Sequence, residues 1–161
     1  MKKMKALLLT FIVAAFAVGN IPANAIEIPK DTLIEIEYLE NGDYIETVIS
    51  NETNDNATCP LATTKTITKS KTKYYKNSAG TVLWSVTIKG TFTYDGSTSK
   101  CTSCSHSASA PASNWSIKSI SSSKSGNSAT AKCVATYKGA IISTDYSMSV
   151  TITCSANGTI S

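Results

Sequence analysis

Cys101, Cys104 and His106 come closest to a reactive site by residue type and spacing. Two thiolates and an imidazole are ligands that zinc prefers, but a zinc site needs a fourth ligand and a turn that brings the thiols together. On a continuous strand Cys101 and Cys104 would point to opposite faces. A thioredoxin-type redox pair would open a helix, and no helical period follows here. We therefore expect no metal and no cofactor.

Catalytic side chains are scarce elsewhere. His106 is the one imidazole of the chain, and no serine lies in a Gly-x-Ser-x-Gly elbow. A carboxylate pair for glycoside hydrolysis would have to come from Asp95 and Asp145 or from the acidic N-terminal part, and both aspartates lie at or near turns that explain them. We expect the protein not to be an enzyme. Nucleic acid is disfavoured as a partner because the chain has no arginine and little aromatic interleaving.

The N-terminus predicts export. Three lysines precede an apolar run from Ala6 to Val18, and the segment ends at Ala23-Asn24-Ala25. These are the parts of a secretory signal peptide, here residues 1–25, with cleavage after Ala25. No second apolar run follows, so we expect a secreted protein whose mature chain does not insert into membranes.

Five cysteines in an exported chain indicate disulfides. Spacing alone does not determine their connectivity. Cys133 and Cys154 fall on the apolar phase of their segments and should point inward. We predict bridges between Cys101 and Cys154 and between Cys104 and Cys133. Cys59 is then left over, and it could instead bridge to the N-terminal part or pair between chains.

Charge divides the mature chain into two parts. Residues 26–55 carry nine acids and one lysine, a net of 1 − 9 = −8, whereas residues 56–161 carry eleven lysines and two aspartates, a net of 11 − 2 = +9. This asymmetry predicts an acidic hairpin and linker over residues 26–58 and a basic, Ser/Thr-rich domain over residues 59–161.

Asn41-Gly42 predicts a two-residue hairpin turn. Pairing across it places Tyr38 opposite Ile45 on an apolar face and Glu37 opposite Glu46 on an acidic face. We expect the apolar face to dock on the domain, with the glutamates near the lysine-rich segment that follows.

The segment 81–94 has the clearest period of two in the chain, with apolar or small residues at even positions from Val82 to Tyr94. It predicts one long strand with a single buried face that includes Trp84. Residues 63–76 alternate hydroxyl and lysine side chains, which is typical of a protected sheet edge. The alternative is a surface that binds an anionic partner. The candidate residues of this surface are Lys65, Lys69, Lys71 and Lys73. Trp115 is added to them, because we expect it to be more exposed than Trp84.

Turn signals separate further alternating segments at 97–108, 115–120, 128–137 and 142–154, with a turn predicted over 121–127. Together with the hairpin they give six to eight strands and an all-β fold. We predict an antiparallel β-sandwich with immunoglobulin-like arrangement, with a small β-barrel as the alternative.

Several phrases of the sequence resemble small secreted β-rich proteins of clostridia and related gut Firmicutes, a group whose function is not established. They are Tyr38-Leu-Glu-Asn-Gly-Asp-Tyr-Ile-Glu-Thr47, Val82-Leu-Trp-Ser-Val-Thr-Ile-Lys-Gly-Thr-Phe-Thr-Tyr94 with its flanks, Cys101-Thr-Ser103, Lys124-Ser-Gly-Asn-Ser-Ala-Thr-Ala131 and Val150-Thr-Ile-Thr-Cys-Ser-Ala-Asn-Gly158. The resemblance implies a secreted β-rich domain and favours the bridge between Cys101 and Cys154.

We therefore expect a secreted, non-catalytic β-sandwich that acts as a binding or surface-structural module. Its partners would be cell-wall or host glycans or an anionic surface. The alternative is a secreted effector, similar to a bacteriocin or toxin, in which the acidic residues 26–58 form a removable pro-segment.

Overall fold

The computed structural model of the chain describes residues 32–50 and 64–161. The predicted signal peptide and linker, with Cys59, lie outside these residues. The described residues form eight strands and contain no helix that could cross a membrane. The strands are β1 (Thr32–Tyr38), β2 (Tyr44–Ser50), β3 (Lys65–Lys76), β4 (Val82–Tyr94), β5 (Ser99–Ser109), β6 (Trp115–Ser125), β7 (Ser128–Lys138) and β8 (Ser143–Thr153).

The eight strands form two antiparallel sheets, one in the order β1-β2-β3-β4-β5 and one in the order β6-β7-β8. β7 packs on β4 and β5, while β8 packs on β3 and β4, so the predicted β-sandwich is confirmed. Every described strand pairs only with its neighbours in the chain. The connectivity is therefore a meander, and the Greek-key crossings of the predicted immunoglobulin-like arrangement are not found among these strands.

The predicted inward phases of β4, β7 and β8 are confirmed. Alternate side chains of these strands fill the space between the sheets. They are Trp84, Val86, Ile88 and Phe92 from β4, Ala129, Ala131, Cys133 and Ala135 from β7, and Met148, Val150 and Ile152 from β8. Small alanines on β7 opposite larger side chains on β4 allow the two sheets to pack closely.

The prediction that the lysine-rich segment is a sheet edge is wrong. β3 lies inside the five-stranded sheet, hydrogen-bonded to β2 along one side and to β4 along the other. Lysines had suggested an edge because charge discourages pairing with another chain. Here the hairpin of the same chain supplies the pairing. The acidic hairpin thus extends the sheet through backbone hydrogen bonds, whereas we had expected its apolar face to dock on the domain.

The predicted hairpin register is wrong by one residue. Tyr38 pairs with Tyr44 and Glu37 pairs with Ile45, so the connection is the five-residue loop Leu39–Asp43. A type I′ turn needs positive φ at both central residues, and only Gly42 has it, at 85°. A shift of one residue turns every side chain to the other face. Glu37 therefore shares a face with Ile45 and not with Glu46.

Two further local predictions need correction. A bulge at Thr102 in β5 places Cys101 opposite Phe92 and Cys104 opposite Gly90, so both cysteines lie on one face. β6 continues to Ser125, although a turn had been predicted from Ser121, because its serines pair with residues of β7 along the whole hairpin.

Candidate functional site

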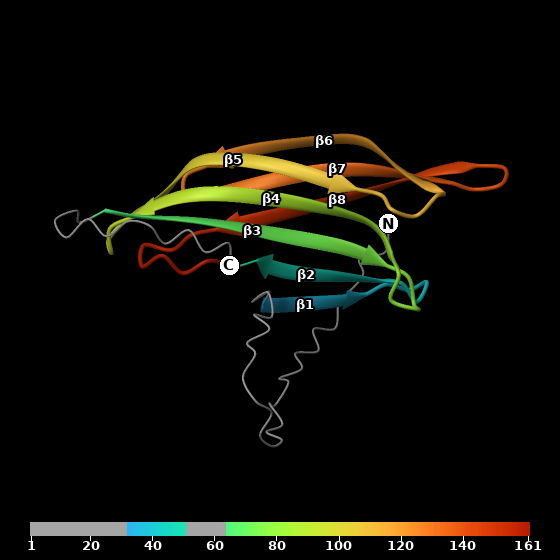
Figure 1. Cartoon of the computed structure of the whole chain (residues 1–161), viewed down its shortest axis with the longest axis horizontal. Helices are drawn as coiled ribbons and strands as arrows, with labels where there is room; N and C mark the ends of the chain where they lie inside the picture. The colour runs from blue at the N-terminus through green and yellow to red at the C-terminus, as the bar shows by residue number, and fades with distance from the viewer. Residues whose placement is uncertain (1–31, 51–63) are drawn as a thin grey trace, which may run out of the picture.

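The two sheets differ in width, and this leaves one side of the sandwich open. β5 and β6 lie against each other on the closed side. On the other side β1 and β2 contact only each other and β3 among the described strands, with nothing of the second sheet above them. Figure 1 shows β1 and β2 below the other six strands. We call β1, β2 and the loop Leu39–Asp43 the wing, and the space between the wing and β8 the open side.

Hydrogen bonds fasten the wing's loop to the sandwich. The Tyr75 hydroxyl donates to Asp43 Oδ2 at 3.0 Å, and Asn41 Nδ2 donates to the same oxygen at 2.8 Å. The Asp43 backbone N–H in turn donates to Asn41 Oδ1 at 3.1 Å. Burial, partly opposed by the Asn41 hydrogen bond, raises the pKa of Tyr75 above its ordinary value. The loop is therefore held in place by the core residue Tyr75.

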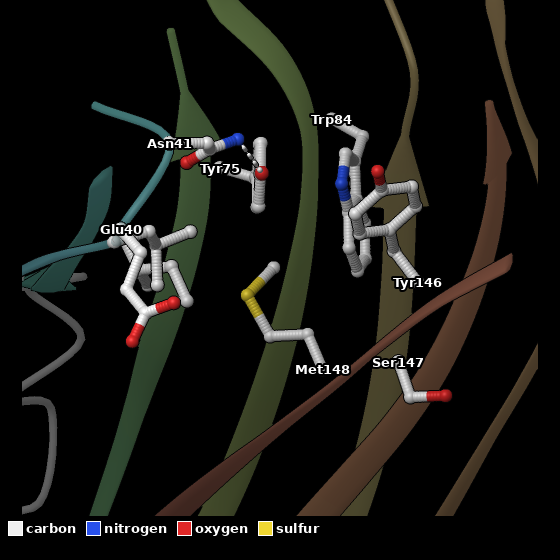
Figure 2. Close-up of a pocket in the computed structure, with 9 residues that line it drawn as sticks. Glu40, Asn41, Tyr75, Trp84, Tyr146, Ser147 and Met148 are labelled. Carbon is white, nitrogen blue, oxygen red and sulfur yellow. Dashed lines mark hydrogen bonds between the residues drawn. The ribbon is translucent and has the colours of Figure 1, made fainter. Parts of the chain in front are cut away.

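A pocket of about 390 Å³ lies between this loop and β8. This volume is at the lower end of the range for small-molecule sites. Its lining is mainly apolar, with polar groups at the rim, as Figure 2 shows. The lining residues are Leu39, Glu40, Asn41 and Ile45 from the wing, Tyr75 and Trp84 from β3 and β4, and Tyr146, Ser147 and Met148 from β8.

Aromatic rings from both sheets form the back of the pocket. Tyr75 lies 6.1 Å from Trp84 and 5.9 Å from Tyr146 between ring centroids. Behind them Trp115 contacts Trp84 at 6.2 Å and Tyr146 at 5.0 Å. Such pairs stabilise a core beyond the area they bury. The rings therefore form a stable back wall.

The Trp84 indole N–H has no hydrogen-bond partner, although the side chain is 1% exposed. Buried donors nearly always find an acceptor, and one without a partner costs about 1–3 kcal/mol. In Figure 2 the indole nitrogen lies on the side of Trp84 nearer Tyr75, whose ring is almost parallel to the indole. The nitrogen itself has almost no exposed surface, so this unpartnered donor belongs to the core behind the pocket.

Two lysines lie beside the pocket on the inner face of β3. Lys73 pairs with Thr47 of β2 and Lys71 pairs with Ile49, so their side chains share the face of Tyr75. Both are half-buried. Burial first, and then the charge of Lys73, lower the pKa of Lys71, while Glu35 opposes the shift. The positive charge here is thus only partly compensated. Of the other predicted surface lysines, Lys69 lies on the same face and Lys65 is exposed at the start of β3.

β8 is an edge strand that borders the open side. It pairs with β7 along its length. On its other edge the described residues form one pairing, in which Thr153 exchanges two backbone hydrogen bonds with Ser161. Backbone groups two residues apart point the same way along a strand. Those of Ser147, Ser149 and Thr151 therefore point over the wing.

The prediction that Trp115 is open to solvent is wrong, since this side chain is 8% exposed within the aromatic cluster. Trp84 is buried as predicted. The sequence contains no local signal for the pocket, because Glu40 at its rim and Leu39 in its wall belong to a five-residue loop where Asn41-Gly42 predicts a two-residue turn.

All four described cysteines are free thiols, so neither predicted bridge is formed in the structure. Cys101 and Cys154 are buried neighbours whose backbone N–H groups donate to the adjacent carbonyls of Gly126 and Asn127, at 2.8 and 3.0 Å. Burial raises the pKa of both thiols; the charge of Cys104 adds to this effect at Cys101, and the charge of Cys101 adds to it at Cys154. Cys104 lies beside Ser122, whereas Cys133 is enclosed in the core. The bridge between Cys101 and Cys154 stays a prediction for the exported protein.

The other candidates for chemistry have structural contacts. Asp95 accepts hydrogen bonds from Ser97 and Thr98 within its turn, and these lower its pKa. Asp145 binds Lys118 and Thr136 on the outer face of its sheet, and these contacts lower its pKa too. His106 Nδ1 lies 2.7 Å from Ser122 Oγ across the closed side. Among the residues that the structure describes, no three side chains are grouped as metal ligands.

No protein-family model, no curated protein and no solved structure matches the chain. The resemblance to the clostridial group thus stays a prediction.

Proposed function

We propose that the chain is a secreted, non-catalytic binding module that holds its partner on the open side of the sandwich. The observation that carries this proposal is the pocket of about 390 Å³ between the wing and β8, with aromatic rings from both sheets as its back wall. Secretion rests on the signal-peptide pattern of residues 1–25.

The wing supplies half of the pocket. Leu39 and Ile45 pack against the core, and Asp43 bonds to Tyr75. A pro-segment that is cut away would take these contacts with it and expose β3. This favours the binding module over the effector alternative, which predicts a mature N-terminus after the wing. Cell-wall or host glycans and anionic surfaces stay candidate partners.

The experiment compares binding by the full protein and by a pocket variant, Leu39→Trp, whose larger ring would fill the space. Both proteins are probed against arrays of bacterial cell-wall fragments, host glycans and peptides. We expect a ligand that binds the natural protein and is lost with Leu39→Trp. The exposed change Ser121→Trp on β6 is the matched control and should bind normally. A ligand that binds all three proteins equally would show that the pocket is not the site.

A further inference from the structure

We infer that the partner on the open side is an extended peptide segment that adds to β8 as a fourth strand of the second sheet. This inference rests on the proposed function and names the class of its partner. It draws on the edge of β8 that the described residues leave unpaired before Thr153, the lysines on the inner face of β3, and the pocket at one end.

The first step is to place an added strand beside β8. A strand that paired with β8 would lie about 4.8 Å beyond it and about 10 Å above the first sheet, which is the usual spacing of packed sheets. Because β8 packs on β3 and β4, that position lies over β2. Thr47 of β2 is only 2% exposed there, so the side chains that cover it would have to move aside for a strand to enter. The outward backbone groups of Ser147, Ser149 and Thr151 would provide the hydrogen bonds, as in other cases of strand addition. The C-terminal residues close the edge at Thr153.

The second step compares two possible partners for the edge of β8: a single extended segment and a second copy of the whole chain. In a second copy β8 is backed by β3 and β4 of its own first sheet. Pairing the two β8 edges would bring those strands to the level that the wing already occupies. A single segment has no such backing, so it can fill the position over β2.

The third step is the pattern of side chains that such a segment needs. Residues of a strand face the wing at every second position. The inner face of β3 and β2 presents rows that are two residues apart: Tyr75 with Ile45, then Lys73 with Thr47, then Lys71 with Ile49. The first row borders the pocket. We therefore expect an apolar residue over the first row and acidic residues over the next two.

The charges of the inner face favour acidic residues. Lys71 and Lys73 are half-buried neighbours on one strand, and each repels the charge of the other. Glu35 and Glu37 face the same side from β1, but both are exposed at the outer edge. A carboxylate above β2 would reach the less solvated lysines, where an ion pair is less screened.

The test is a titration of the full protein with two capped peptides, Thr-Phe-Thr-Glu-Thr-Glu-Thr and its reversal, since strand direction is open. Matched peptides with Gln for Glu measure the charge contribution. We expect one acidic peptide to bind at least about fivefold more tightly than its Gln version, a difference typical of one or two modest ion pairs. Added salt should reduce this difference. Amide resonances of Ser147, Ser149 and Thr151 should shift and become protected from exchange.

Variants separate the parts of the inference. Lys71→Glu with Lys73→Glu should abolish the preference for acidic peptides. Ser147→Pro removes an outward N–H without touching the β7 ladder and should weaken binding about tenfold. The exposed change Lys132→Glu on the outer face of β7 is the charge control and should bind normally.

The outcomes are distinct. If the acidic and Gln peptides bind equally, or if Ser147→Pro binds as tightly as the natural protein, the strand-addition inference is overturned. If only neutral glycans bind, and they perturb the pocket, the inference fails while the proposed function stands. If peptides bind but perturb only residues of the closed side, both fail.

Discussion

Gly90 lies in the middle of β4, where a methyl group would strain the core. A Cβ built there would meet Phe92 Cε2 at 2.6 Å, Phe92 Cζ at 2.7 Å and Ile152 Cγ2 at 3.3 Å. Carbon atoms in a packed core are separated by about 3.5–4.0 Å, so the Phe92 ring would have to move by about 1 Å. Phe92 and Ile152 are both 0% exposed, so neither side chain can move out into solvent without disturbing the core.

We predict that Gly90→Ala destabilises the fold. Overpacking of a core costs about 1–3 kcal/mol. Alanine recovers about 0.5–1 kcal/mol because glycine loses more backbone entropy in a strand. The net loss is about 0–2.5 kcal/mol with a centre near 1 kcal/mol, which lowers the melting temperature by up to roughly 10 °C in a chain of this size. Urea and thermal unfolding followed by circular dichroism would measure both quantities.

A double-mutant cycle tests whether contact with the Phe92 ring causes the loss of stability in Gly90→Ala. Phe92→Leu removes the ring atoms that the methyl group meets, so Gly90→Ala should cost less in that background than alone. Ser149→Ala, on the exposed face of β8, is the control and should change stability by less than about 0.5 kcal/mol. Strictly additive effects of Gly90→Ala and Phe92→Leu, or a stabilised Gly90→Ala variant, would refute the reasoning.

Three further predictions concern ionisable groups and thiols. Burial raises the pKa of Tyr75 in the folded protein, so the contribution of this residue to stability is present below pH 10 and is lost as the pH rises through its folded pKa. In a pH titration followed by absorbance near 295 nm, Tyr75 should be the last tyrosine to ionise, and this last step should vanish in Tyr75→Phe. The folded pKa of Lys71 is lowered instead, so stability should rise with pH towards 10.5, and Lys71→Met should be more stable at pH 7 in urea unfolding. A bridge between Cys101 and Cys154 would close a loop of 53 residues (154 − 101 = 53) and add about 4 kcal/mol. Intact masses after alkylation, with and without reduction, would detect it, and alkylation of both thiols without reduction would contradict it.

The sequence predicted the sandwich because the signal was local. The alternation from Trp84 to Phe92 and from Ala129 to Ala135 needs no knowledge of distant partners. It failed where the outcome depends on a neighbour in space. The lysines of β3 predict an edge strand, because nothing in the sequence near them shows that β2 pairs with β3.

The site was hidden for a similar reason. Asn41-Gly42 favoured a two-residue turn, but the hydrogen bonds of Asn41 and Asp43 with Tyr75 hold a longer loop. That change of register turned Glu37 to the other face and made Leu39 and Glu40 lining residues of a pocket. A contact across 32 residues thus determined what the local pattern left open.

The central claim is that the open side between the wing and β8 binds a partner. The most direct measurement follows the Trp84 indole N–H resonance of the full protein by NMR during the peptide and glycan titrations. We expect this resonance to shift in step with the amides of Ser147 and Ser149. Saturable binding that leaves Trp84 unchanged and shifts residues of β5 and β6 would contradict the claim.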